Sequence, residues 1–550
     1  MQYTTGPVAH PIRERITLYH IAEQRLRRLI DAGQAGLLRE RNVGLEKESL
    51  RVARSGGIAQ TPHPRTLGAA LTNPYLTTDY SEALLEFITP PCSDPREALA
   101  FLHDLHKFVY DRLDDELLWA TSMPCVLAGA SSIPIAEYGR SNVGMMKTVY
   151  RRGLGHRYGK MMQVIAGVHF NYSLSDEFWA AYHTLEGADV SRRAFIDDAY
   201  MGMVRNLQRY GWLVPYLFGV SPAVCKSFLE GLRTRLPEFD ANTFYEPFAT
   251  SLRMGDIGYQ NNREGEIGIK ACYDSLDSYV DSLTCAIETP SPEYERIGVL
   301  VDGEYRQLNA NMLQIENEYY STVRPKQVLE DNEKPTLALK RRGIRYVELR
   351  SLDVNAFDPL GISEDQLYFL EALMVFCLLQ DSPAIGAQEA AAIDRNQNQA
   401  AHRGRDPQLK LERAGQMLPL RQWGLELLDA MAGICAVLDG HPSGGPYSAS
   451  LARQRAALQD PALTPSARML TEMRESREGF YHFALRMSQK HHRYFAATAL
   501  DAERQAFLDE VARRSLREQG EIEAAERLDF GDYLARYFAQ GTAERPAATS

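Results

Sequence analysis

Two glutamates one residue apart, Glu46 and Glu48, stand within residues 43–52, a run that we interpret as a β-strand. In a β-strand, residues i and i+2 point to the same face, so these carboxylates are expected to lie side by side. Like charges at that separation repel each other, and a shared cation removes the conflict. The alternative is the solvated face of an antiparallel sheet, where alternation of polar and apolar faces is normal. The pair therefore predicts a cation site or a wet sheet face.

Two more strand-like segments carry polar side chains of the same kinds. Within residues 77–90, Glu86 interrupts an apolar run and Asp79 lies upstream of it. A single glutamate in such a run can equally belong to a sheet edge. A third segment places His169 and Asn171 on one strand face and apolar residues on the other. That histidine can be a structural residue or a metal ligand.

A fourth segment places Glu348 and Arg350 on one strand face. The two can form a simple ion pair. Together, however, the four segments offer carboxylates, one imidazole and one guanidinium, without a thiolate. Such donors suit Mg²⁺ or Mn²⁺ rather than Zn²⁺. These cations bridge polyphosphate oxygens, and an arginine can stabilise a phosphoryl group during transfer. Because no Walker A loop is present, nucleotide handling is expected to rest on metal and arginine.

The elements that must position these residues predict an α+β fold. The first part of the chain mixes strand-like and helix-like segments, with a hairpin turn at Asp302-Gly303 and a helix over residues 193–209. Strands and helices do not alternate regularly, which favours an antiparallel sheet over a βαβ repeat.

The second part, from Ser363 onward, is predicted to be almost wholly helical. Ser363 and Gln366 form a capping-box pattern ahead of a buried helix. Loops are expected at residues 394–407 and 440–446, and a charged amphipathic helix over residues 501–519.

Composition excludes several classes of protein. The chain has 550 residues, 45% hydrophobic and 24% charged, with a formal net charge of −11, which gives no sign of a nucleic-acid or anionic-membrane surface. We find no apolar stretch that could span a bilayer and no signal-peptide core. The seven scattered cysteines contain no C-x-x-C pair, which argues against a zinc site and a secreted disulfide framework. We therefore expect a cytoplasmic protein with mostly reduced thiols.

Eight segments, in order along the chain, resemble glutamate–cysteine ligase (γ-glutamylcysteine synthetase) of the proteobacterial type. The resemblance runs from about residue 20 past residue 360, and more loosely through the helical part. The segments are residues 44–52, 77–90, 122–125, 138–142, 158–171, 251–254, 313–320 and 346–353.

This resemblance implies a fold distantly related to glutamine synthetase. Its curved antiparallel sheet would form a funnel-shaped active site, packed with helices and followed by a helical C-terminal part. Residues 20–360 would form the catalytic core and residues 361–540 the helical part of the same unit, with residues 1–19 and 541–550 flexible. The implied reaction is ATP-dependent: the γ-carboxylate of glutamate is phosphorylated, and the amine of cysteine then displaces phosphate.

The resemblance also implies roles for individual residues. Arg350 would face the transferred phosphoryl group and Arg253 the glutamate carboxylate. Tyr80 stands where relatives are expected to have phenylalanine, which concerns selectivity rather than the reaction. The implied ligands of Mg²⁺, or of Mn²⁺, are Glu46, Glu48, Asp79, Glu86, His169 and Glu348. The implied cysteine pocket consists of Tyr80, Tyr150, Leu154, Gln163, Ile165, Tyr259 and Tyr320.

Three other functions remain open at this point. One is a related ligase that joins glutamate to another amine, and another is a Mg²⁺-dependent phosphohydrolase, since carboxylate clusters also serve two-metal hydrolysis. The third is a non-enzymatic scaffold. For the ligase, the expected partners are small molecules (L-glutamate, L-cysteine and ATP), and the expected state is a monomer.

Overall fold

The computed structural model describes residues 19–229, 234–258, 270–330, 332–441 and 443–541. Tyr259 and nearly all of the two terminal segments expected to be flexible lie outside them. The central element is an antiparallel sheet in the order β10-β11-β5-β1-β3-β2, and β4 also pairs with β1. Its strands are β1 (Arg41–Ala53), β2 (Leu76–Thr78), β3 (Leu84–Ile88), β4 (Glu116–Leu118), β5 (Gly167–Leu174), β10 (Val323–Lys326) and β11 (Tyr346–Asp353).

Three two-stranded ladders lie outside this sheet. They are β6 (Ala223–Cys225) with β7 (Thr243–Tyr245), β8 (Leu300–Val301) with β9 (Glu304–Tyr305), and β12 (Lys410–Arg413) with β13 (Gln416–Pro419). The α-helices are α1 (His20–Asp31), α2 (Pro95–Tyr110), α3 (Asn142–Tyr158), α4 (Asp176–Glu186), α5 (Arg192–Tyr210), α6 (Leu213–Phe218), α8 (Leu276–Glu288), α9 (Pro292–Ile297), α10 (Pro335–Arg342), α11 (Glu364–Leu379), α12 (Ala387–Arg403), α13 (Leu420–Asp439), α14 (Pro446–Gln459), α15 (Pro465–Ser476), α16 (Phe480–Ala496), α17 (Ala502–Ala525) and α18 (Phe530–Ala539).

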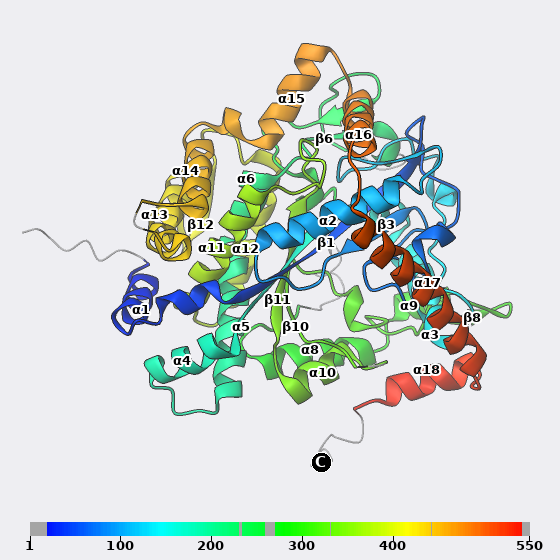
Figure 1. The fold of residues 1–550 in the computed structure, drawn as a ribbon, viewed down its shortest axis with the longest axis horizontal. Helices are drawn as coiled ribbons and strands as arrows, with labels where there is room; N and C mark the ends of the chain where they lie inside the picture. The colour runs from blue at the N-terminus through cyan, green and yellow to red at the C-terminus, as the bar shows by residue number, and fades with distance from the viewer. Residues whose placement is uncertain (1–18, 230–233, 259–269, 331, 442, 542–550) are drawn as a thin grey trace, which may run out of the picture.

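The two faces of the central sheet differ in chemistry because side chains alternate along each strand. One face is apolar and packs into the core through residues such as Leu45, Phe87 and Phe170, each 0% exposed. Helix α2 crosses this face over β1 and β3 (Figure 1), and its His106 stacks on Phe87 at 4.2 Å between ring centroids. The opposite face is left for polar side chains.

The C-terminal helices surround the sheet rather than forming a separate lobe. Helix α11 is buried along almost its whole length and packs against α5, α13 and α14. Figure 1 shows α13 and α14 on one side of the molecule and α17 and α18 on the other. Among the described residues, no helix is long and apolar enough to cross a membrane.

Several predicted elements are confirmed. The antiparallel sheet is present, α5 covers residues 193–209, and α17 covers residues 502–519 with Asp501 as its N-cap. Asp302 and Gly303 turn between β8 and β9 with positive φ. Ser363 and Gln366 form both hydrogen bonds of the capping box at the start of α11.

Other predictions are wrong. The expected loop at residues 394–407 is mostly the last turns of α12, whose alanine, glutamine and glutamate residues favour helix without an apolar stripe. The helical C-terminal part also contains the β12–β13 hairpin. The expected single strand over residues 77–90 is two strands, because a turn after Asp79 brings its N–H 2.9 Å from the carbonyl of Leu84.

The cysteines also differ from expectation at one pair. Cys125 and Cys225 form a disulfide, with their Cα atoms 5.5 Å apart. The remaining five cysteines are free. The bond joins the loop after β4 to β6, across 100 residues of sequence. Such a long-range pairing depends on tertiary structure, so cysteine spacing does not reveal it.

Candidate active site

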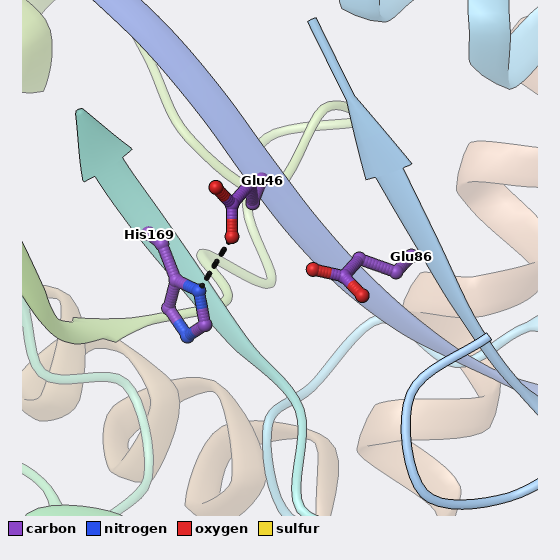
Figure 2. Close-up of side chains that lie close together, drawn as sticks. All are labelled: Glu46, Glu86 and His169. Atoms are coloured by element: carbon purple, nitrogen blue, oxygen red, sulfur yellow. Dashed lines mark hydrogen bonds and ion pairs between the residues drawn. The ribbon is translucent and has the colours of Figure 1, made fainter. Parts of the chain in front are cut away.

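Strand register brings the predicted ligands together on the polar face of the sheet. Glu46 lies opposite His169 in the β1–β5 pair, and Glu48 lies opposite Glu86 in the β1–β3 pair. Glu46, Glu86 and His169 form what we call the acid–histidine cluster (Figure 2). One ligand atom from each lies within 4.8 Å of the other two.

Hydrogen bonds orient these side chains from the same strands. Nδ1 of His169 is 3.2 Å from Oε2 of Glu46, and Asn171 donates to the other oxygen of Glu46 at 2.9 Å. The backbone N–H of Gly167 donates to Glu48 at 2.6 Å. Both glutamates of β1 are therefore held by groups of β5: Glu46 by the side chains of His169 and Asn171, which share one strand face, and Glu48 by the backbone of Gly167.

The cluster is electrostatically strained without a cation. Burial, followed by repulsion from Glu46 and Asp79, raises the pKa of Glu86 well above its usual value. Burial also raises the pKa of Glu48. Burial would raise the pKa of Glu46 too, but contact with His169 keeps it below its usual value. An added cation would favour the charged form of all these carboxylates.

Glu348 extends the cluster toward β11. Its side chain is 0% exposed, and Oε1 lies 3.1 Å from Arg350 and 3.7 Å from His169. Lys326 lies 3.7 Å from Oε2. Despite these charges, neither oxygen accepts a hydrogen bond from any residue that the structure describes. Burial opposes ionisation, but the nearby cations hold the pKa of Glu348 well below its usual value.

These donors fit a hard divalent cation. The described donors are buried carboxylates and one imidazole, and none is a thiolate. Glu348 has both of its oxygens without a hydrogen bond from a described residue. Such a set matches the oxygen-rich sites of Mg²⁺ and Mn²⁺. Buried charges of this kind are rare unless they are paired or bind metal.

A cavity of about 1140 Å³ opens beside the cluster. Ile165 is 1% exposed and does not line it, and Tyr259 lies outside the described residues. Glu46, Glu86 and Glu348 share the polar sheet face but are not in the cavity wall. The other predicted residues do line the cavity: Glu48, Asp79, Tyr80, Tyr150, Leu154, Gln163, His169, Arg253, Tyr320 and Arg350.

Arg253 is fixed in the cavity wall by contacts with β11. Its NH1 is 3.6 Å from Asp353, and its NH2 donates to the carbonyl of Arg350 at 3.0 Å. A Cβ atom on Gly167 would lie only 2.1 Å from this guanidinium, so the close approach requires glycine. Asp353 is held in turn by Ser251 at 2.9 Å. The guanidinium is thus preset toward the cavity.

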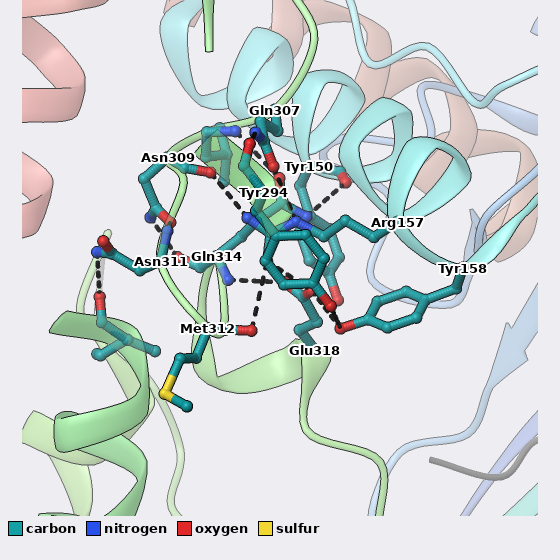
Figure 3. Close-up of polar contacts among 12 residues, drawn as sticks. Tyr150, Arg157, Tyr158, Tyr294, Gln307, Asn309, Asn311, Met312, Gln314 and Glu318 are labelled. Carbon is teal, nitrogen blue, oxygen red and sulfur yellow. Dashed lines mark hydrogen bonds and ion pairs between the residues drawn. The ribbon is translucent and has the colours of Figure 1, made fainter. Parts of the chain in front are cut away.

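A buried polar network holds further residues of the cavity wall in place (Figure 3). Arg157 at the end of α3 pairs with Glu318 at 2.9 Å, and both side chains are 0% exposed. Tyr158 donates to the same carboxylate at 2.8 Å, and the guanidinium lies 4.0 Å from the ring centroid of Tyr294. The network joins α3, which carries Tyr150, to the segment before β10. No sequence pattern indicated it, because the partners lie far apart in the chain.

Two further cavity residues were missed for the same reason. Arg151 lies 3.8 Å from Asp79, next to the metal-ligand candidates. His402 on α12 lies between Glu246 and Asp256, at 2.7 Å from each. The one local signal for Arg151 is its adjacency to Tyr150, and His402 lies in the part of α12 for which the sequence predicts a loop, residues 394–407.

Comparisons with known proteins show the family to which this chain belongs. The sequence model of the family described as glutamate-cysteine ligase matches residues 26–400. The chain belongs to the glutamate–cysteine ligase family. A glutamate–cysteine ligase from Alcanivorax borkumensis is 46% identical over 522 residues, covering 94% of this chain and 99% of the relative. One from Pseudomonas paraeruginosa is 48% identical over 517 residues, covering 94% and 98%.

A solved structure of the same family has a similar fold. The crystal structure of glutamate–cysteine ligase from Francisella tularensis in complex with AMP superposes with a TM-score of 0.86 at 35% identity. The match covers 92% of this chain and 98% of that one.

Proposed function

We propose that this glutamate–cysteine ligase joins the γ-carboxylate of L-glutamate to the amine of L-cysteine at the expense of ATP. The observation that carries the proposal is the convergence of the acid–histidine cluster and Arg350 on one sheet face beside a large cavity. Membership in the glutamate–cysteine ligase family supports glutamate and cysteine as substrates. The AMP in the related crystal structure supports an adenine nucleotide as the third.

Glu46, Glu48, Asp79, Glu86, His169 and Glu348 would hold Mg²⁺, with Mn²⁺ as a substitute. A bound divalent cation offsets the charge of the polyphosphate and of the transferred phosphoryl group. Asn171 and the backbone of Gly167 hold Glu46 and Glu48 in position, so ligand geometry would be preset by β5.

The reaction would proceed through γ-glutamyl phosphate. An oxygen of the glutamate γ-carboxylate attacks the γ-phosphorus of ATP, and ADP leaves. The amine of cysteine then attacks the acyl carbon, loses a proton, and inorganic phosphate leaves. Arg350, beside Glu348, would stabilise charge on the phosphoryl oxygens, while Arg253 would bind a carboxylate of glutamate.

The amine substrate would bind against the wall formed by Tyr80, Tyr150, Leu154, Gln163 and Tyr320. Ile165, which does not line the cavity, would not contact it, and the assignment of Tyr259 stays a prediction from the resemblance. Aromatic and aliphatic groups suit a small, polarisable thiol. The curved sheet would form a funnel-shaped active site, with residues 20–360 as the catalytic core and residues 361–540 as the helical part of the same unit. We further propose a monomer in the cytoplasm.

A phosphate-release assay tests the function. ATP hydrolysis is measured with neither amino acid, with glutamate alone, and with glutamate plus cysteine, and the product is identified by mass. We expect release that needs both amino acids and gives γ-glutamylcysteine. Release without amino acids would support a phosphohydrolase, and a need for an amine other than cysteine would support a neighbouring ligase.

A further inference from the structure

We propose that Arg324 is a second arginine that contacts the transferred phosphoryl group, beside Arg350. The inference rests on the proposed function and deepens it. Arg324 is on β10, the edge strand next to β11, directly opposite Glu348 in the register. Paired residues of neighbouring strands share a sheet face, so Arg324, Glu348 and Arg350 all belong to the polar face. Arg324 and Arg350 both line the cavity.

The hydrogen bonding of Arg324 leaves most of its donors for a ligand. It donates to the carbonyls of Asn317, at 3.1 Å, and Tyr319, and both bonds leave from one nitrogen, NH2. A guanidinium has five N–H donors. Within the described residues, Nε and NH1 of Arg324 make no further hydrogen bond. Its side chain is nevertheless buried, and the residue is 9% exposed.

The charge of Arg324 is also not matched by a carboxylate. Three other arginines of the cavity wall lie near an acid: Arg151 near Asp79, Arg157 near Glu318, and Arg253 near Asp353. A further one, Arg235, is exposed to solvent, unlike Arg324. Arg324 forms no ion pair with any described residue within 4.0 Å.

The acid that lies opposite Arg324 in the register, Glu348, already contacts other cations. Glu348 lies 3.1 Å from Arg350 and 3.7 Å from Lys326. Of the three cationic side chains on β10 and β11, two therefore contact this carboxylate within 4.0 Å, and Arg324 does not. Burial, followed by the charge of Arg350, lowers the pKa of Arg324, in keeping with a cation held against another cation.

An anion between Arg324 and Arg350 would relieve this repulsion. A phosphoryl group is the substrate anion that must lie here, because it must contact both the metal-ligand candidates and Arg350. Two guanidinium groups together can bind several phosphoryl oxygens, as the planar fork of arginine allows.

A purely structural arginine is the alternative, and the chain offers a matched control. Arg205 is also buried and donates to backbone carbonyls, those of Tyr273, Asp274 and Ser382, but it does not line the cavity. If Arg324 only anchors the carbonyls of Asn317 and Tyr319, its variants should behave like those of Arg205.

The experiment compares Arg324→Lys and Arg324→Met with Arg205→Lys and Arg205→Met. For each variant, Tm, kcat and the KM values for ATP, glutamate and cysteine are measured. We expect Arg324→Met to lower kcat about 100-fold, the typical cost of one transition-state donor. KM for cysteine should change little, and Arg324→Lys should recover only part of the rate. The Arg205 variants should lower Tm and leave kcat nearly unchanged.

A second measurement does not depend on turnover. Inorganic phosphate, added with Mg²⁺ and ADP, should raise the Tm of the unmodified enzyme and of Arg205→Lys, but not that of Arg324→Lys. Unchanged kcat in Arg324→Lys, or the same Tm rise with phosphate, would overturn the inference. An unmodified enzyme that makes no γ-glutamylcysteine would instead overturn the proposed function.

Discussion

Nδ1 of His169 lies 3.2 Å from Oε2 of Glu46, directly across the β1–β5 pair. Its other ring nitrogen is 3.9 Å from Glu48, and Glu348 lies 3.7 Å from Nδ1. One imidazole thus stands among three carboxylates. An arrangement with so much negative charge costs stability unless a cation is present, and this gives the first prediction.

Loss of metal ligands should abolish activity without unfolding the protein. We expect Glu46→Gln, Glu48→Gln and His169→Ala to lose turnover at limiting Mg²⁺, while circular dichroism stays unchanged. Glu86→Gln should raise Tm in EDTA at pH 7.5, since a carboxyl group whose pKa is raised in the folded state costs stability at every pH above its usual unfolded value of about 4.3. The gain should vanish at pH 4, where Glu86 is protonated. The control is Glu97→Gln on the exposed side of α2. Full activity of Glu48→Gln would contradict the ligand assignment.

Substitution of Arg350 should slow phosphoryl transfer more than it weakens cysteine binding. Its position 3.1 Å from Glu348 fixes it beside the metal-ligand candidates. We expect Arg350→Ala to lower kcat by about 1000-fold or more, with Arg350→Lys rescuing poorly because the planar fork is lost. KM for cysteine should move little. A variant that phosphorylates glutamate normally but fails with cysteine would assign Arg350 to the second half-reaction.

Tyr80 offers a test of the amine pocket. Its hydroxyl is buried and has no hydrogen-bond partner among the described residues. Tyr80→Phe should therefore raise the free energy of unfolding by about 1 kcal/mol, measured by urea denaturation. 2-Aminobutyrate should replace cysteine with a kcat/KM roughly 10- to 200-fold lower. A large rise in KM for cysteine in Tyr80→Phe would mean that the hydroxyl contacts the substrate.

The stability of the protein should fall at alkaline pH through His402. Burial lowers the pKa of His402, but Asp256 and Glu246 outweigh it and raise the pKa to about 9. Because the pKa exceeds the unfolded value of about 6.5, the stabilisation is complete below pH 6.5 and is lost as pH rises through 9. We expect His402→Gln to lower Tm at pH 6 and to have little effect at pH 10. His441→Gln, at an exposed site, is the control. An equal Tm deficit at both pH values would show that the charge of His402 is irrelevant.

The disulfide should contribute to stability. Cys125→Ala with Cys225→Ala should lower the free energy of unfolding by about 2–5 kcal/mol, since the bond closes a long loop. Dithiothreitol should lower the Tm of the unmodified protein and leave that of the double variant unchanged. Cys285→Ala, an exposed free thiol, serves as control. No change in either experiment would indicate that the bond has no stabilising role.

The residues that share one face of a strand could be predicted from the sequence, because the side chains of a strand alternate between its two faces and this alternation is local. It identified the polar faces of β1, β5 and β11, and with them Glu46, His169 and Glu348. The grouping of the ligands also needed the register, which depends on how distant strands pair. The resemblance to a family supplied that information where periodicity could not.

Features that depend on tertiary contacts were not predictable. The partners Arg157 and Glu318 are 161 residues apart, and only folding brings them together. The last turns of α12 lack an apolar stripe, so the residue pattern predicts a loop over residues 394–407. The alanine, glutamine and arginine residues in those turns nevertheless favour helix. The turn after Asp79 is also set by pairing of β2 with β3 rather than by a turn motif.

Strand β1 forms one wall of two different compartments. Leu45 belongs to the core, whereas Glu46 and Glu48 on the same strand belong to the polar face of the sheet. Deleting a single residue within β1 would exchange these sides, burying carboxylates among leucines and exposing leucine to the polyphosphate. The active site can therefore change by substitution, but its strand cannot change in length. Selection for folding alone would preserve the spacing of these glutamates even in a chain that no longer needed to bind metal.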